Sequence, residues 1–156
     1  MKKVSSLIVW IVGLQLVGFA IGHLIQGSIP TWYLQLPQAP LSPPYQVFSI
    51  AWITLYVLIA VAGWYLWSHA SNAQFGKAKV TYVLQMLFNW SWSPIFFTAH
   101  AVTAAFIVLC ATTLFTIATI AYTWRDAKTT AYLLIPYALW LCFAAYLNGY
   151  ILLDLG

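Results

Sequence analysis

The segment at residues 81–97, TYVLQMLFNWSWSPIFF, places hydrogen-bonding side chains inside an otherwise apolar stretch. Gln85, Asn89 and Ser93 recur every four residues, so they would share one face of a helix, with Trp92 beside them. Two amides, a hydroxyl and an indole could line a cavity and fix the orientation of a bound ligand. They could equally form hydrogen bonds between neighbouring helices, each worth about 0.6 kcal/mol in a membrane protein. The pattern alone leaves both interpretations open.

Side chains suited to acid–base, nucleophilic or metal chemistry are scarce. The chain contains no Glu, and its two acids, Asp126 and Asp154, lie outside the long apolar segments. Cys110 and Cys142 are not close to a His in the sequence, and no metal-ligand spacing is present. Hydrolytic, phosphoryl-transfer and metal chemistry are therefore disfavoured, while binding of a flat, apolar, aromatic ligand is favoured. We expect no metal site and no nucleic-acid partner.

The three histidines lie near the ends of apolar segments. We expect His23 and His100 near one membrane face and His69 near the other. His23 or His100 could serve as an axial haem ligand, although a histidine at the membrane interface with its hydrogen bonds satisfied is the simpler interpretation.

Large aromatic side chains occur in two further apolar segments. Trp52 and Tyr56 are separated by four residues, about one helical turn. Trp140 and Ala144 have the same spacing, and Asn148 follows one turn later. A large ring next to a small side chain creates a gap that can admit a flat ligand or a neighbouring helix.

The elements that must position these side chains follow from the composition. The 156 residues are 63% hydrophobic and only 5% charged, with two acids and six basic residues. A soluble domain carries about 25% charged residues, so this chain could not build a soluble surface. It is expected to be an integral membrane protein that is entirely helical.

Breaks in the hydrophobic pattern divide the chain into five expected membrane spans within one membrane domain that covers residues 1–156. Each span has about the 20 apolar residues that a bilayer core requires. The expected spans are residues 4–27, 45–68, 80–98, 101–123 and 131–153, and a Pro-rich extramembrane loop at 28–44 follows the first span.

The basic residues support this count. With five spans, all of them fall on one side of the membrane: Lys2, Lys3, Lys77, Lys79, Arg125 and Lys128. The positive-inside rule then places the N-terminus in the cytoplasm and the C-terminus outside, as expected for a bacterial inner membrane. A model with four or six spans would destroy the segregation.

The loop sequence WYLQLPQAPLSPP, residues 32–44, combines four prolines with a Trp-Tyr pair and no charge. One interpretation is a stiff connector between the first two spans. The other is a lid over the mouth of the bundle, with Trp32 and Tyr33 turned towards a ligand. Proline reduces the number of amide donors that need partners, and a charge-free aromatic segment suits an apolar pocket better than solvent.

Four separate segments resemble the tryptophan-rich sensory protein and translocator protein family. The resemblance covers residues from about 30 to 150, and its motifs are WYLQLPQAPLSPP at 32–44, Trp52 followed by Leu55-Tyr56, NWSWSPIFF at 89–97 and PYALWLCFAAYLN at 136–148. It implies a bundle of five membrane helices with a ligand pocket beneath the loop after the first helix. The implied ligand-binding residues are Tyr33, Pro43, Trp52, Gln85, Asn89, Trp92, Ser93, Trp140, Ala144 and Leu147.

The resemblance also implies a function. Family members bind porphyrins such as protoporphyrin and haem, so we expect a receptor or transporter-like protein that binds such ligands for sensing, sequestration or transport. No cofactor is expected to be required, because the porphyrin or haem is the ligand. One alternative is an enzyme that degrades porphyrins with light and oxygen through Trp52 and Trp140. Another is a membrane assembly partner without a ligand of its own.

Two departures from the family pattern restrict the expectation. The loop lacks the Lys and the Trp that family loops often carry before the paired prolines, and no basic residue follows Tyr150, so specific cholesterol binding is not predicted. The family implies a homodimer. Gly18 and Gly22 form a Gly-x-x-x-Gly motif that could serve dimerisation or contacts within the bundle.

Overall fold

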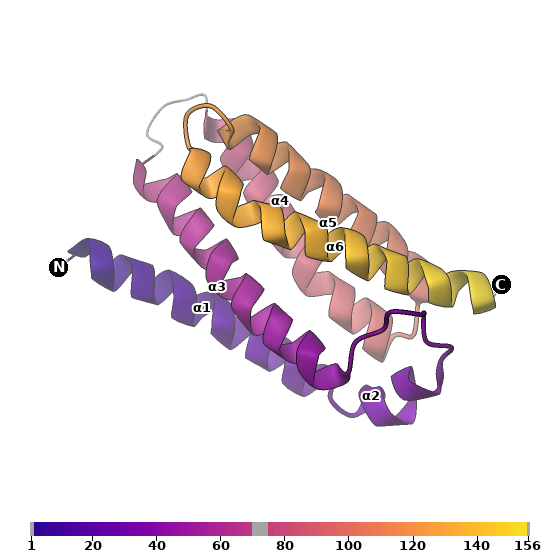
Figure 1. Cartoon of the computed structure of the whole chain (residues 1–156). Helices are drawn as coiled ribbons and strands as arrows, with labels where there is room; N and C mark the ends of the chain where they lie inside the picture. Colours follow the sequence, from indigo (N-terminus) through magenta and orange to yellow (C-terminus); the bar gives the residue numbers. More distant parts are fainter. Residues whose placement is uncertain (1, 70–74, 156) are drawn as a thin grey trace.

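The computed structural model describes residues 2–69 and 75–155, and the regular secondary structure of this part of the chain is entirely helical, without a strand. Five long helices, α1 (Lys2–Ile25), α3 (Tyr45–His69), α4 (Gly76–Ser93), α5 (Val102–Thr123) and α6 (Lys128–Leu155), lie side by side (Figure 1). Short helical turns, α2 (Ser28–Thr31), η1 (Tyr33–Gln35) and η3 (Pro94–Thr98), lie at the end of the bundle where α1 stops and α3 starts.

Four of the long helices are long and apolar enough to cross a membrane: α1, α3, α5 and α6. The helix α4 falls short because Lys77 and Lys79 occupy its first turn and the amides of Gln85 and Asn89 lie in its middle. The expectation of an all-helical membrane protein is therefore confirmed, but the count of five spans exceeds the four that length and composition establish.

The helices surround the bundle axis in the order α1, α3, α6, α5, α4, and neighbours in this order pack against one another. The last contact, between α4 and α1, is the weakest of the ring. Among the described side chains of α1, only Ile25 is buried. The helix α1 is thus the most loosely attached member, whereas α3 to α6 contain nearly all of the buried core.

Hydrogen bonds between helices hold α3, α4 and α6 together. The Tyr82 hydroxyl on α4 donates to the carbonyl of Ile59 on α3 at 2.7 Å, and the Thr130 hydroxyl on α6 donates to the carbonyl of Ala62 at 3.2 Å. Buried threonines on α5 instead donate to carbonyls of their own helix one turn earlier: Thr112, Thr116, Thr119 and Thr123. The Thr119 hydroxyl also lies 2.8 Å from the Thr81 hydroxyl of α4, so this row of threonines faces the neighbouring helices.

The glycine motif on α1 acts within the bundle. A Cβ atom added to Gly18 would lie 2.9 Å from Cε2 of Tyr56, so this glycine allows α1 and α3 to approach closely. Nothing lies within 4 Å of a Cβ placed on Gly22. The homodimer expected from the resemblance therefore gains no support from Gly18.

The Pro-rich segment expected as a loop at 28–44 contains the short helices α2 and η1. Trp32 packs on the buried Phe96, with the ring centroids 5.2 Å apart, and it also stacks on His100, with the ring centroids 4.2 Å apart and the planes inclined by 15°. His100 has φ 54°, a left-handed conformation that is uncommon for residues other than Gly. The Trp32–His100 stack attaches the segment to the turn between η3 and α5.

The turn η3 continues α4 through Pro94 as a π-helix. The amide of Ala99 donates to the carbonyl of Pro94 at 3.0 Å, five residues earlier, instead of four. This wider turn carries Phe96 and Phe97, both buried, under the segment that contains Tyr33.

Candidate ligand-binding site

A cavity of about 740 Å³ lies between α1, α3 and the C-terminal half of α4. Side chains of α1 between Ile11 and Gln26 form one wall, and side chains of α3 between Tyr45 and Tyr56 form another. Tyr33 and Pro43 close the end of the cavity nearest the Pro-rich segment. We call this space the main cavity.

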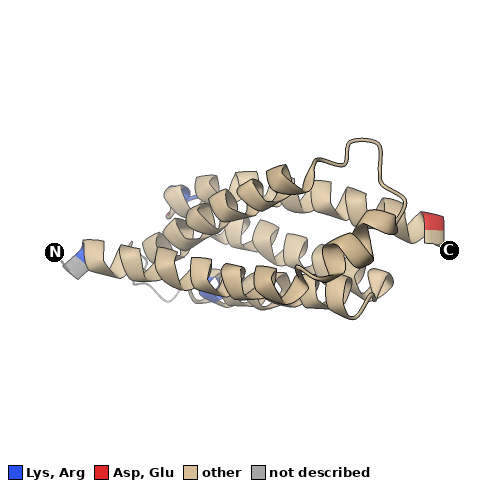
Figure 2. Cartoon of the chain, turned by 90° about the horizontal axis from the view of Figure 1, so that it is seen from below, with Lys and Arg blue, Asp and Glu red and all other residues tan. Residues whose placement is uncertain are grey.

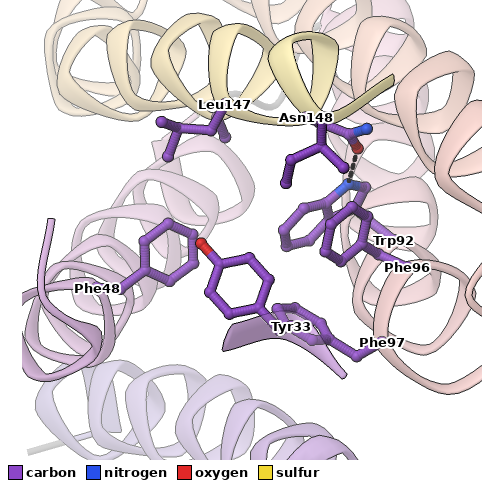
Figure 3. Close-up of a pocket in the computed structure, with 9 residues that line it drawn as sticks. Tyr33, Phe48, Trp92, Phe96, Phe97, Leu147 and Asn148 are labelled. Carbon is purple, nitrogen blue, oxygen red and sulfur yellow. Dashed lines mark hydrogen bonds between the residues drawn. The ribbon is translucent and has the colours of Figure 1, made fainter. Parts of the chain in front are cut away.

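Six of the predicted site residues line the main cavity: Tyr33, Pro43, Trp52, Asn89, Trp92 and Ser93. A second cavity of only about 20 Å³ lies on the α6 side, where Ala144 and Leu147 face Tyr33 and Trp92 (Figure 3). Its volume matches a single water molecule, not a drug-sized ligand. Gln85 and Trp140 line neither cavity.

Four aromatic side chains, Tyr33, Phe48, Trp92 and Phe97, line both cavities and so separate them. We call these four residues the aromatic partition. Figure 3 shows the Tyr33 ring between Phe48 on one side and Trp92 and Phe97 on the other. The Tyr33 and Phe97 ring centroids are 5.4 Å apart, and those of Trp92 and Phe97 are 6.0 Å apart. The predicted site is therefore divided, and its α6 residues lie behind the partition.

Trp140 lies behind Trp52 when viewed from the main cavity. Their ring centroids are 6.5 Å apart with perpendicular planes, and Phe48 packs on Trp140 at 5.4 Å. The Trp140 indole nitrogen is buried and has no hydrogen-bond partner. Trp140 supports the rings that face the cavity instead of facing it itself.

The amide of Asn89 is held from both sides. The Tyr56 hydroxyl on α3 donates to Asn89 Oδ1 at 2.8 Å, and Asn89 Nδ2 donates to the Tyr137 hydroxyl on α6 at 2.9 Å. All three residues are buried. A ligand in the main cavity would therefore meet an amide whose orientation is already fixed, with a remaining lone pair on Oδ1 as its free acceptor.

Gln85 lies on the same face of α4 as Asn89, but its side-chain amide makes no hydrogen bond. It is fully buried, and neither its Oε1 nor its Nε2 has a hydrogen-bond partner. The spacing of four residues correctly indicated that both amides lie on one face of α4. Only the amide of Asn89 reaches the tyrosine hydroxyls and the main cavity.

Trp92 connects α4 to α6. Its indole nitrogen donates to Asn148 Oδ1 at 3.3 Å, and Asn148 Nδ2 donates to the carbonyl of Val102 at the start of α5 at 3.2 Å (Figure 3). The ring also stacks on Phe96 with centroids 5.5 Å apart. These contacts fix the Trp92 ring at the boundary between the two cavities.

The end of the main cavity nearest the Pro-rich segment carries no formal charge from Tyr33. Burial raises the pKa of the Tyr33 phenol above its ordinary value, because the ionised form would lose its hydration. The hydroxyl therefore stays neutral at physiological pH, and the ring acts as an apolar cover with one polar tip.

Several residues of the main cavity lie on and just after α1 and were not among the predicted site residues. Gln15, Gly18, Gly22 and Gln26 line the main cavity, and so does His23, which the sequence suggested only as a possible haem ligand. They include most of the polar or small side chains in the second half of that span, and their spacings of three and four residues mark one helical face. This spacing is the sequence pattern from which the contribution of α1 to the cavity could have been predicted.

Comparison with known proteins agrees with the architecture. The TspO/MBR family profile matches residues 8–153. The translocator protein of Ovis aries is 35% identical, with 84% of this chain and 79% of that protein covered. The tryptophan-rich protein TspO of Archaeoglobus fulgidus is 30% identical over 94% of both chains, and the tryptophan-rich sensory protein of Cereibacter sphaeroides is 32% identical over 75% of this chain and 72% of that one. The chain belongs to the TspO/MBR family.

Proposed function

We propose that this membrane protein binds flat, apolar tetrapyrroles such as protoporphyrin or haem in the main cavity, for sensing, sequestration or transport. The observation that carries the proposal is the main cavity itself, whose volume of about 740 Å³ falls in the range of small-molecule sites, about 300–1,000 Å³. The names of two relatives, translocator protein and tryptophan-rich sensory protein, refer to transport and sensing in those proteins.

Two indoles supply the faces on which a flat ligand would stack. Trp52 and Trp92 both line the main cavity, with ring centroids 6.5 Å apart and planes inclined by 29°. Burying an apolar macrocycle against them would provide most of the binding free energy. Asn89 and Ser93 would fix its orientation, and Tyr33 and Pro43 would cover it.

The remaining predicted residues would act indirectly. Trp140 supports Trp52, while Ala144 and Leu147 lie beyond the aromatic partition. Gln85 lies within the core next to the amide that faces the cavity. We propose that these four residues influence binding through the position of the rings that touch the ligand.

We also propose that α4 and η3 form a fifth span. The 18 residues of α4 extend about 27 Å at 1.5 Å per residue, and η3 lengthens the element towards the thickness of a bilayer core, about 30 Å. Figure 2 shows the coloured basic residues towards the N-terminal end of the bundle and an acidic residue at the C-terminus. The positive-inside rule then places the N-terminus in the cytoplasm. A C-terminal tag accessible only from the cytoplasm would contradict this orientation.

A titration with protoporphyrin tests the proposed function. The shift of the porphyrin absorption band is followed in wild type, in Trp52→Ala and in Trp124→Phe, which alters an exposed tryptophan far from the cavity lining. Loss of a stacking partner should weaken binding about tenfold in Trp52→Ala, since an aromatic pair contributes about 0.5–1.5 kcal/mol beyond area burial. Non-saturable binding in all three proteins would refute the proposal.

A second candidate function is light- and oxygen-dependent degradation of the bound porphyrin. It is favoured by an uninterrupted series of ring contacts from the cavity inwards, Trp92 to Trp52 and Trp52 to Trp140, each with centroids 6.5 Å apart. After one indole loses an electron, the radical cation could be shared among the three tryptophan rings. Illumination should then bleach the porphyrin band and yield a new product. Equal bleaching after both Trp52 and Trp140 are changed to Phe would show ordinary photobleaching.

A further inference from the structure

The main cavity contains one side chain that can carry a positive charge near neutral pH. His23 lies in the last turn of α1 and lines the cavity. The other titratable groups along the lining are the phenols of Tyr33, Tyr45 and Tyr56, and no Lys, Arg, Asp or Glu is among the lining residues. An imidazolium at this position would have no competing acid in the cavity and would attract an anion.

The side chain of Gln26 occupies one of the two ring nitrogens of His23. The side-chain amide of Gln26, three residues later, lies 2.9 Å from His23 Nδ1. An amide can offer either its nitrogen or its oxygen to Nδ1, so Gln26 can satisfy this atom in both the neutral and the protonated ring. Nε2 is then the atom left for a ligand. A cation in the last turn of a helix also interacts favourably with the free carbonyls there.

Two polar side chains deeper in the cavity already have hydrogen-bond partners. Gln15 Nε2 on α1 donates to the carbonyl of Ile53 at 2.8 Å, and the Tyr56 hydroxyl is bonded to Asn89. Eight residues separate Gln15 from His23, which corresponds to about 12 Å along α1. The cavity is thus aromatic and hydrogen-bonded at depth, and chargeable at the end where α1 stops. This gradient fits a molecule with an apolar body and an acidic side group.

We infer that His23 binds a carboxylate of the ligand through Nε2, so that the site selects tetrapyrroles that carry acidic side chains. The inference rests on the proposed function, because it names a determinant of the same cavity. A charge-assisted hydrogen bond between imidazolium and carboxylate forms without displacing any other contact of His23. Since His23 is exposed, the bond should contribute about tenfold in affinity, the low end for a hydrogen bond to a charged group.

Two forms of one macrocycle test the inference. Protoporphyrin IX carries two carboxylates, and its dimethyl ester carries none. Wild type should bind the acid about tenfold more tightly than the ester. The His23→Ala and His23→Gln variants should lose the preference while their affinity for the ester stays unchanged. His69→Ala, which alters a histidine outside the cavity lining, should keep the preference.

The outcomes separate this inference from the proposed function. If wild type binds acid and ester equally, or if His23→Ala weakens both equally, His23 does not bind a carboxylate although the cavity still binds the macrocycle. If neither compound saturates wild type, the tetrapyrrole function fails and the inference fails with it. If His23→Ala weakens iron protoporphyrin but not the metal-free acid, the ring coordinates iron and the inference is overturned.

Discussion

Two amides one turn apart on α4 should respond to substitution with opposite signs. Gln85 and Asn89 lie on the same face and are both buried, yet Gln85 has no hydrogen-bond partner and Asn89 has two. We predict that Gln85→Met stabilises the bundle and that Asn89→Leu destabilises it. Because both changes replace an amide by an apolar side chain of similar length, the difference isolates the state of hydrogen bonding.

The magnitude follows from the number of polar atoms affected. A buried polar group without a partner costs about 1–3 kcal/mol, so removal of both amide atoms of Gln85 should raise the free energy of unfolding by about 2 kcal/mol or more. Asn89→Leu would leave the Tyr56 hydroxyl without its partner and would leave the Tyr137 hydroxyl with Thr116 alone, a cost of about 2–4 kcal/mol. For a chain of this size each kcal/mol shifts Tm by about 2–4 °C, so the two variants should differ by about 8 °C or more.

Thermal unfolding of the purified protein in one detergent, followed by circular dichroism, measures the two shifts under identical conditions. The double variant tests whether the effects add, as expected if the two amides share no partner. A fall in Tm for Gln85→Met as large as that for Asn89→Leu would refute the reasoning. It would show that Gln85 forms hydrogen bonds that stabilise the native state.

Two further predictions concern glycines of α1 and α3. Gly22→Ala is the control for both: it should leave the free energy of unfolding unchanged or raise it by up to about 1 kcal/mol, because nothing lies within 4 Å of the added Cβ. Gly18→Ala should lower Tm and weaken porphyrin binding, since the new Cβ would lie 2.9 Å from the Tyr56 ring; an unchanged Tm would show that the ring moves freely. Gly63→Ala should destabilise by about 1–3 kcal/mol, because its Cβ would clash with the Tyr82 hydroxyl of α4 and would lie 2.6 Å from Cζ3 of Trp10 on α1; a Tm equal to that of wild type would contradict the close packing of these two side chains on Gly63.

The sequence predicted the positions of the long helices well because apolar runs and charge are strong signals in a membrane protein. The expected span at 45–68 corresponds to α3 at Tyr45–His69, and the expected span at 101–123 to α5 at Val102–Thr123. Hydropathy alone does not identify α4 as a membrane span. Its amide side chains face neighbouring helices, and they lower its hydropathy below that of a helix that faces lipid.

The site was predicted less completely because periodicity identifies a face but not what fills the space in front of it. Trp52 and Trp140 were both expected in the pocket, yet Trp52 stands between Trp140 and the cavity. For the same reason, the periodicity of α4 could not show that Asn89 lines the main cavity and Gln85 does not. Only the packing of α3 against α6 determines which of two aromatic rings faces the hollow, and that packing depends on side chains distant in the sequence.

The main cavity is open at its side, because several of its lining side chains are exposed: Val12, Leu16, Phe19 and Ile53. Protein interiors are close-packed, so an open space of about 740 Å³ must be filled by ligand, lipid or water in the membrane. Because the buried core resides in α3 to α6 and α1 contributes only Ile25 among its described side chains, an occupant of the cavity would replace the contacts that α1 does not make. Ligand, lipid or water in this space is therefore part of the stability of the bundle, and a tightly bound tetrapyrrole should raise Tm together with the order of α1.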